Sequence, residues 1–219
     1  MTTLAIIGAS GLAREALAVV REAGELLPIG VFDDAASGLG STFSGLPVLG
    51  EIDQVEAVRA DLYLVCVGAG LARERIVERL RMRGVLENRY ATVVDPSVRN
   101  PAGCPIGAGS ILLSHVSITA DVIIGEHVAV MPGVTITHDD VIERYATLAA
   151  GVSLGGSVRV CRGAYLGMNA AVFPGVRIGA GAVIGMSAAV LRNVPAGETW
   201  AGVPARELSI ADRLFERTS

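Results

Sequence analysis

The sequence contains no lysine and very few aromatic residues. All 18 basic residues are arginine, and the 22 acidic residues outnumber them, which gives a formal net charge of −4. We read the absence of lysine as a composition bias rather than a functional signal. The net negative charge provides none of the basic surface that nucleic-acid binding requires. Aromatic residues make up 4% of the chain and hydrophobic residues 51%, so the core must consist of Val, Ile, Leu and Ala.

Cysteine is scarce, and long apolar runs are missing. Cys66, Cys104 and Cys161 are far apart and form no CxxC pair, which argues against a disulfide framework and a cysteine-type zinc site. No run reaches the roughly 18 residues of a membrane span without glycine or charge. The N-terminus has no basic region before its short apolar run, unlike a signal peptide. We therefore expect a soluble, cytoplasmic protein without membrane insertion.

Glycine, by contrast, is abundant, and its 27 residues indicate many tight turns. The N-terminal part alternates between short apolar runs and longer amphipathic segments. We predict strands over residues 3–8, 28–34 and 61–70, helices over 10–24, 51–60 and 71–84, and a last strand or connector over 89–94. This alternation predicts a small parallel sheet with crossover helices. The sequence thus indicates an α/β domain over residues 1–90.

The remainder of the chain follows a six-residue period. From Ile106 onward every sixth residue is Ile, Leu or Val for fifteen consecutive positions. These positions are Ile106, Leu112, Ile118, Ile124, Val130, Ile136, Ile142, Leu148, Leu154, Val160, Leu166, Val172, Ile178, Ile184 and Val190. The residue four places later is small or Val in most hexads, with Asp140 as the main exception.

A six-residue period is typical of a parallel β-helix built from hexapeptides. Each hexad supplies a short strand and a turn, three hexads close one triangular coil, and the branched residue points inward. A β-sandwich with fortuitous spacing is the alternative, and the unbroken series argues against it. We predict the β-helix over residues 91–206 and a helical tail over 207–219.

His138 is the polar residue that this coil model makes most interesting. It is third in its hexad, so it lies at a corner and its ring should project from the prism. Gly156 follows one coil later and leaves bare backbone beside the ring, which suits acyl transfer by a base near free N–H groups. A solvated turn residue is the alternative. His115 and His127 fall on the other two sides of the triangle, so a three-histidine metal site would require neighbouring chains, and we expect none.

The N-terminal domain carries glycine turns suited to a phosphate group. Gly8, Ser10 and Gly11 lie between a predicted strand and a helix N-terminus, a geometry that attracts phosphate. Asp33 and Asp34 end the second strand, where the fold commonly contacts a base or ribose. Gly68 belongs to a second glycine turn at the same sheet edge. Tight strand-to-helix turns without a ligand are the alternative.

The unbroken hexads, the ending "WAGVPAR" and the start "GASG" resemble the left-handed β-helix acyltransferases. More narrowly, they resemble the branch of sialic acid O-acetyltransferases and bacterial UDP-4-amino-sugar N-acetyltransferases (NeuD/PglD-type). The resemblance covers essentially the whole chain. It implies a Rossmann-like N-terminal domain that binds the nucleotide of an activated sugar, a left-handed coil, a homotrimer and acetyl-CoA as co-substrate. Histidine is common after the glycine of "GASG" in this branch, whereas Leu12 and Ala13 stand here.

The resemblance also implies roles for individual residues. The motif [IV]-x-H-[DE] matches residues 136–139, which implies that His138 is the general base and that Asp139 orients it. Asp140 either forms hydrogen bonds within the turn or shares the orienting role. Many members carry a second histidine nine residues after the base, where this chain has Thr147. A threonine hydroxyl at that position is still able to donate to the acyl carbonyl.

The function that the resemblance implies is acetyl-CoA-dependent N-acetylation of a UDP- or dTDP-linked 4-amino sugar. O-acetylation of a sugar or sialic acid is one alternative, and a non-catalytic nucleotide-sugar-binding or scaffold protein is another. Acetyl-CoA is expected in a groove between neighbouring coils, in a site shared by two subunits. The residues expected to contact it are Thr147, Gly156, Gly167, Met168, Gly185, Met186, Gly202 and Pro204.

Overall fold

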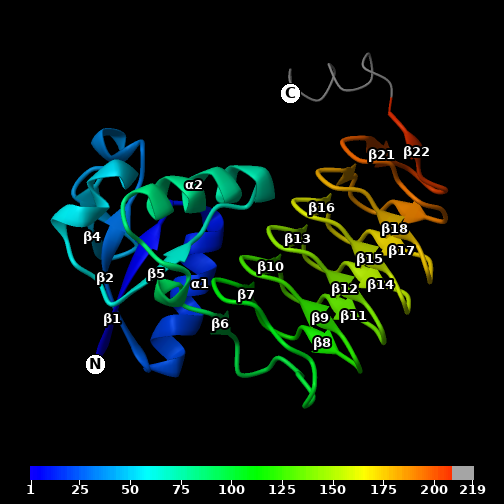
Figure 1. The fold of residues 1–219 in the computed structure, drawn as a ribbon, viewed down its shortest axis with the longest axis horizontal. Helices are drawn as coiled ribbons and strands as arrows, with labels where there is room; N and C mark the ends of the chain where they lie inside the picture. The colour runs from blue at the N-terminus through cyan, green and yellow to red at the C-terminus, as the bar shows by residue number, and fades with distance from the viewer. Residues whose placement is uncertain (209–219) are drawn as a thin grey trace.

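The computed structural model describes residues 1–208, which form an α/β domain followed by a β-helix (Figure 1). The two-part fold predicted from the sequence is therefore confirmed. The predicted helical tail over residues 207–219 lies outside the described residues except at its start. There, Glu207 belongs to the last strand, β22.

The N-terminal sheet has five strands in the order β3-β4-β2-β1-β5. All neighbours are parallel except β3 and β4, which form an antiparallel hairpin that the sequence did not predict. The carboxyl ends of β1, β2 and β5 consequently meet at one sheet edge. The strand bounds are β1 Thr2–Ile7, β2 Leu26–Phe32, β3 Thr42–Phe43, β4 Leu46–Gly50 and β5 Leu62–Val65.

Two α-helices cover this sheet, α1 (Gly11–Ala23) and α2 (Gly70–Met82). Successive residues of a strand point to opposite faces of the sheet. Accordingly, Leu4 and Ile6 of β1 pack in one apolar cluster with α1. Ala5 and Ile7, which point to the other face, pack in a second cluster with α2. Both helices therefore bury an apolar stripe, as the predicted crossover topology requires.

One predicted helix is wrong in type. Residues 51–60 do not form an α-helix, because the helical segment is a 3-10 helix that ends at Ala57. A capping box between Glu51 and Gln54 closes its first turn, and Val58 has extended backbone angles. The segment thus leaves the helical region before the periodicity of an α-helix is established. Two further 3-10 helices span Ala36–Gly38 and Glu87–Arg89.

The β-helix has three faces of short parallel strands. Face 1 contains β6 Val93–Val94, β7 Ile111–Leu112, β10 Ala129–Val130, β13 Thr147–Leu148, β16 Tyr165–Leu166, β19 Val183–Ile184, β21 Thr199–Ala201 and, antiparallel to β21, β22 Arg206–Glu207. Face 2 contains β8 Ser117–Ile118, β11 Thr135–Ile136, β14 Ser153–Leu154, β17 Ala171–Val172 and β20 Ala189–Val190. Face 3 contains β9 Ile123–Ile124, β12 Val141–Ile142, β15 Arg159–Val160 and β18 Arg177–Ile178.

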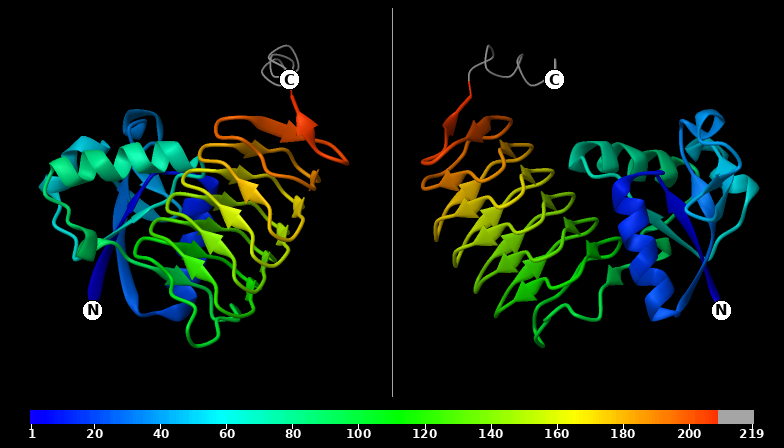
Figure 2. Two further views of the ribbon diagram at one scale, coloured as in Figure 1. Left: turned by 45° about the vertical axis from the view of Figure 1, so that its right-hand side comes forward. Right: turned by 180° about the vertical axis from the view of Figure 1, so that it is seen from behind.

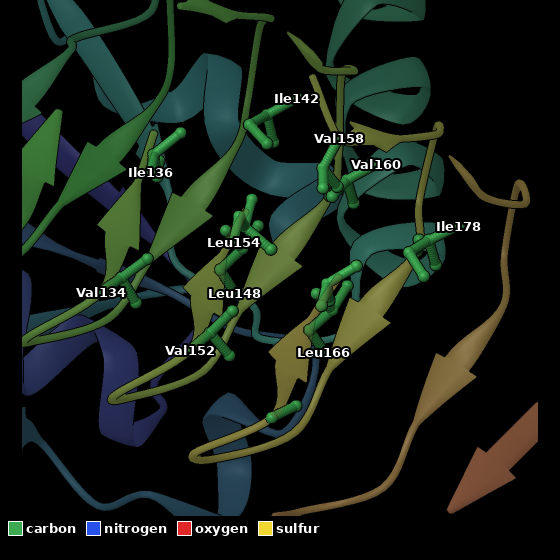
Figure 3. Close-up of a cluster of buried hydrophobic side chains, with 14 of the residues drawn as sticks. Val134, Ile136, Ile142, Leu148, Val152, Leu154, Val158, Val160, Leu166 and Ile178 are labelled. Carbon is green, nitrogen blue, oxygen red and sulfur yellow. The ribbon is translucent and has the colours of Figure 1, made fainter. Parts of the chain in front are cut away.

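The predicted interior residues fill the prism. Every member of the six-residue series from Leu112 to Val190 is buried, and residues eighteen apart pair in register, as Leu148 does with Leu166. Figure 3 shows side chains from all three faces converging on the interior, with Leu148, Leu154 and Val160 among them. Stacking branched aliphatic residues in this way buries a continuous apolar core, which Trp200, paired with Ile184, joins near its C-terminal end. The coil is the left-handed β-helix expected from the sequence.

The turns between the faces form three corners. Corner 1–2 follows face 1 and includes residues 149–152, 167–170 and 185–188. Corner 2–3 follows face 2 and includes residues 137–140 and 155–158. Corner 3–1 follows face 3 and includes residues 125–128, 143–146 and 161–164. Because the prism is triangular, corner 2–3 is opposite face 1.

The N-terminal domain docks on face 1 and corner 3–1. Outward-facing Ile111 and Ala129 of face 1 belong to the same apolar cluster as α1. At corner 3–1, the side chain of Leu71 at the start of α2 lies against Gly163. The strands β21 and β22 lie far from this interface (Figure 2). The two domains consequently share part of one hydrophobic core.

Candidate active site

His138 follows β11 and lies at corner 2–3. Its side chain is 65% exposed, which confirms that the ring projects from the prism. Nδ1 lies 2.8 Å from Oδ2 of Asp139, whose backbone has a positive φ of 62°. A carboxylate only accepts hydrogen bonds, so Nδ1 carries the hydrogen and Nε2 keeps its lone pair. This tautomer leaves Nε2 free to accept a proton from a substrate.

Gly156 lies directly beneath this imidazole. A Cβ atom at Gly156 would overlap Cε1 and Nε2 of His138, so the close approach requires glycine. The imidazole itself therefore fills the space over Gly156, where the sequence indicated only bare backbone beside the ring. Glycine at this position sets where the imidazole rests.

The amide of Gly156 has no hydrogen-bond partner among the described residues. The backbone N–H of the third residue in a hexad takes no part in the backbone hydrogen bonds between coils. Proline, which has no N–H, accordingly occupies this position at Pro96, Pro132 and Pro174. A free amide is thus common at these corners, although Arg162 at the same hexad position donates to Glu143. At Gly156 it is a donor close to His138, which gives the site one candidate oxyanion donor.

Asp140 belongs to the turn and not to the His138–Asp139 pair. It is fully buried, and its carboxylate accepts from the N–H of Thr137 (2.8 Å) and from that of Val158 one coil later (2.7 Å). Ser110 occupies the equivalent hexad position and accepts from Val128 one coil later in the same way. Burial raises the pKa of Asp140 to about 6, although both N–H donors favour its charged form. Of the two roles considered, the structure supports hydrogen bonding within the turn.

Thr147 lies far from His138, on face 1 beneath the N-terminal domain. It is fully buried, its hydroxyl donates to the carbonyl of Gly68 (2.8 Å), and it accepts from Nη2 of Arg73 (3.1 Å). The expectation that this hydroxyl contacts the acyl donor is therefore wrong. The sequence could not indicate this burial, because it results from domain docking.

The three histidines lie at three different corners, as predicted. His115 is exposed at corner 1–2, and His127 is buried at corner 3–1 between the rings of Tyr90 and Tyr145. Within residues 1–208, no group of three or more His, Cys, Asp or Glu side chains is arranged to hold a metal ion. In the same part of the chain, neither α-helix has the length and apolar character of a membrane span.

The glycine turn after β1 is held by polar side chains of the same sheet edge. Gly8 has a φ of 98°, and a Cβ there would be 2.8 Å from Cγ2 of Val67, so only glycine fits. Ser10 caps α1 by accepting from the N–H of Ala13 and donates to the carbonyl of Cys66. Gly11 is the first residue of α1 and has open space at its Cβ position. This turn leaves room for a ligand at the helix N-terminus.

The two aspartates after β2 have different partners. Asp33 accepts from the N–H of Ala9 at 2.7 Å and so braces the glycine turn. Asp34 forms a two-point ion pair with Arg79 of α2, at 2.7 and 3.0 Å, and this pairing lowers the pKa of Asp34. Arg79 therefore competes with the base or ribose that Asp34 was expected to contact.

The residues expected along the CoA groove gather at the end of face 1. Met168 is 51% exposed and Met186 is 73% exposed, and both lie at corner 1–2, one coil apart. A Cβ at Gly167 would be 2.7 Å from the amide nitrogen of Met186, and one at Gly185 would be 2.8 Å from Cβ of Ala201. Coil spacing therefore requires both glycines. Gly202 and Pro204 follow β21 at the same corner.

The predicted parts of the site do not meet within one chain. His138 is at corner 2–3, the CoA residues are at corner 1–2, and face 2 separates them. The nucleotide turns belong to the domain docked on face 1, which is opposite corner 2–3. In a single chain, the three predicted parts of the site thus lie on different sides of the β-helix.

Comparisons with known proteins identify relatives of both domains. Residues 3–80 match the PglD N-terminal domain family. The acetyltransferase domain of PglB from Neisseria gonorrhoeae, solved with acetyl coenzyme A, is 24% identical with a TM-score of 0.86, covering 94% of this chain and 98% of that chain. No curated protein matches the sequence.

Two further structures are similar over almost their whole length. PerB from Caulobacter crescentus, a structure in complex with CoA and GDP-perosamine, is 26% identical with a TM-score of 0.86, covering 95% of this chain and 98% of that chain. WeeI from Acinetobacter baumannii is 29% identical with a TM-score of 0.80, covering 95% of this chain and 100% of that chain. Residues 3–80 are therefore similar to the PglD N-terminal domain, and the described chain shares its architecture with the PglB acetyltransferase domain, PerB and WeeI.

Proposed function

We propose that this protein is an acetyl-CoA-dependent N-acetyltransferase that acts on the amine of a nucleotide-linked amino sugar. The observation that carries the proposal is the exposed His138–Asp139 pair, with its free Nε2, on a fold shared with PerB. PerB has been solved with CoA and GDP-perosamine, which supports this substrate class. We expect the protein to act in the cytoplasm, where acetyl-CoA is available.

In the proposed reaction, the amine nitrogen attacks the thioester carbonyl carbon of acetyl-CoA while Nε2 of His138 takes the amine proton. Asp139 holds Nδ1–H and stabilises the resulting imidazolium. The tetrahedral intermediate then collapses, the carbon–sulfur bond breaks, and the sulfur receives the proton from His138. The products are the amide and the thiol of CoA, and the imidazole is neutral again. The Gly156 N–H is the candidate donor to the intermediate's oxyanion.

We further propose that the functional unit is a homotrimer with sites shared between neighbouring subunits. The supporting argument is geometric, because His138 is across the prism from its own N-terminal domain. Phe173 and Leu191 at corner 2–3 are 58% and 57% exposed, and apolar side chains in such positions favour association. The nucleotide end of one subunit would then meet His138 of another. Light scattering that returns a monomer mass at micromolar concentration would contradict this assembly.

The activity is tested by measuring CoA release with acetyl-CoA and a panel of GDP-, UDP- and dTDP-linked 4-amino sugars. We expect turnover with at least one amino sugar and none with the 4-hydroxy sugar on the same nucleotide. Turnover with only the hydroxy sugar would establish O-acetylation instead. Binding of a nucleotide sugar without any CoA release would favour the non-catalytic alternative.

A further inference from the structure

Arg73 is a buried charge that bridges the two domains. Only 1% of the residue is exposed, and burial lowers the pKa of its guanidinium to about 10, so it stays charged at neutral pH. No carboxylate among the described residues bonds to it. Its acceptors are instead the carbonyls of Val67 (2.5 Å), Gly68 (3.3 Å), His127 (2.7 Å), Tyr145 (3.0 Å) and Ala146 (2.9 Å), together with the hydroxyl of Thr147 (3.1 Å).

These acceptors come from two distinct parts of the chain. Val67 and Gly68 belong to the loop between β5 and α2, at the sheet edge where the nucleotide is expected. The other acceptors belong to face 1 and corner 3–1 of the β-helix. Thr147 adds a direct link, because its hydroxyl donates to the carbonyl of Gly68 at 2.8 Å. Arg73, itself anchored to the β-helix, and Thr147 thus hold two consecutive carbonyls of this loop.

Holding these carbonyls also orients the amides of the loop. In a trans peptide the C=O and the following N–H point in opposite directions, and the bonds here are trans, since the cis bond of the described chain is Val203–Pro204. With the carbonyls of Val67 and Gly68 turned toward the β-helix, the N–H groups of Gly68 and Ala69 point away from it. Neither N–H has a hydrogen-bond partner among residues 1–208.

The amides that are turned outward lie beside the first glycine turn. Gly8 is close enough to Val67 that a Cβ there would be 2.8 Å from Cγ2, so the two turns are neighbours at one sheet edge. Consecutive unpaired N–H groups form a concave donor site for anions. The diphosphate of an activated sugar is an anion of this kind.

We propose that Arg73 and Thr147 are positioning residues, through which the β-helix aims the Gly68 and Ala69 amides at the diphosphate of the nucleotide sugar. This inference rests on the proposed function, since it names how the same substrate is held. It also explains Thr147, because a small hydroxylated side chain reaches the Gly68 carbonyl in a site with no exposed surface. The role of Thr147 is to fix the nucleotide end, at a distance from the acyl donor.

The test uses Thr147→Val, which keeps the shape of the side chain and removes the hydroxyl. We measure affinity for GDP, UDP and dTDP by calorimetry and retain the nucleotide that the wild type binds best. Losing one positioning hydrogen bond should weaken that affinity roughly 3- to 10-fold, whereas acetyl-CoA affinity should stay unchanged. Thr147→Ser, which restores the hydroxyl, should return nucleotide affinity to within about twofold of the wild type.

Thr199→Val is the matched control, since Thr199 lies on face 1 at the equivalent position of β21 and away from the N-terminal domain. Its nucleotide affinity should equal that of the wild type. Unchanged affinity in a folded Thr147→Val protein would overturn the inference, even if the melting temperature falls, and would leave the proposed function standing. A wild type that binds none of the three nucleotides would overturn both.

A second measurement does not depend on any variant folding. In the wild type, the amides of Gly68 and Ala69 should exchange hydrogen rapidly without ligand and become protected when the preferred nucleotide is added. Binding without protection at these two amides would overturn the inference.

Discussion

His127 and His138 occupy two corners of the same β-helix, and each imidazole lies over a glycine one coil away. A Cβ at Gly109 would overlap the ring of His127, as one at Gly156 would overlap that of His138. The surroundings differ. His127 lies between the rings of Tyr90 and Tyr145, with centroids at 4.5 and 5.4 Å, whereas His138 is exposed to solvent.

The chemistry of the two rings differs accordingly. Neither nitrogen of His127 has a hydrogen-bond partner among the described residues, and burial, together with the charge of Arg73, lowers its pKa to about 4. It is a neutral ring that packs between domains. His138 has Asp139 on one nitrogen and, among the described residues, no hydrogen-bond partner at the other. The docked N-terminal domain covers His127 at corner 3–1 and leaves His138 at corner 2–3 exposed. For this reason His127 is a structural residue, whereas His138 is the candidate base.

Replacing the exposed ring should have the largest effect on activity. We expect His138→Ala to lower turnover roughly 10²- to 10⁴-fold, the usual contribution of a positioned general base, with little change in melting temperature. The control is His115→Asn, another exposed corner histidine, with a φ of 60° that asparagine tolerates. Near-wild-type CoA release by the His138 variant would remove it from the mechanism.

The buried ring should instead act on stability through pH. The pKa of His127 is about 4 in the folded state and near 6.5 in an unfolded chain. Between these values the unfolded state binds the proton more readily, so stability falls as pH drops from 6.5 to 4, by about 3 kcal/mol in total.

His127→Phe keeps a ring and cannot be protonated, so it should lack this loss. Urea unfolding of both proteins at pH 7 and 4.5 makes the comparison. The contribution of Asp140, whose raised pKa acts in the opposite direction, is common to both proteins and cancels. Equal pH dependence in the two proteins would show that His127 is not the titrating group.

A methyl group beneath the His138 ring should have a moderate effect on turnover. Gly156→Ala displaces the imidazole, and an off-rotamer ring costs about 0.5–1.5 kcal/mol, so turnover should fall up to about tenfold while the coil stays folded. Gly38→Ala adds the same methyl group where no atom lies within 4 Å, and it should be neutral. Unchanged activity in Gly156→Ala would mean that the ring functions from another orientation.

The smallest effect on turnover is expected from replacing Asp139, the hydrogen-bond partner of His138. Asp139→Asn keeps a residue that tolerates the positive φ and removes the negative charge beside an exposed imidazole. Exposed ion pairs contribute about 0.2–1 kcal/mol, so turnover should fall roughly 2- to 5-fold. A loss as large as that of His138→Ala would show that Asp139 controls the tautomer and not only the charge.

The six-residue period and the residue types were sufficient to predict the β-helix. The spacing of Leu112, Ile118 and Ile124 fixes which side chains point inward, because only a triangular coil buries every sixth residue. The same spacing placed His138 at a corner. It could not show that the ring rests on Gly156, since ring direction depends on a rotamer and not on register.

The contacts between the domains were less accessible to prediction. Thr147 has the same strand position as Tyr165 and Val183, each of which is 37% exposed. The six-residue period therefore predicts the same outward orientation for all three side chains. Only the docked domain makes Thr147 buried. Arg73 likewise reads as one of several arginines in a charged helix, and its bridging position is not visible in local periodicity. Docking brings together residues separated by more than seventy positions, as in the Arg73–Thr147 contact.

The apolar cluster shared by α1, Ile111 and Ala129 also has a consequence for how the protein unfolds. The β-helix interior is filled by its own residues, but α1 and the outer side of face 1 each supply part of the apolar surface that the other buries. Separating them would expose this cluster and leave the Arg73 guanidinium and its carbonyls without partners, at a cost of several kcal/mol. We therefore expect the docked domains to unfold in one cooperative transition.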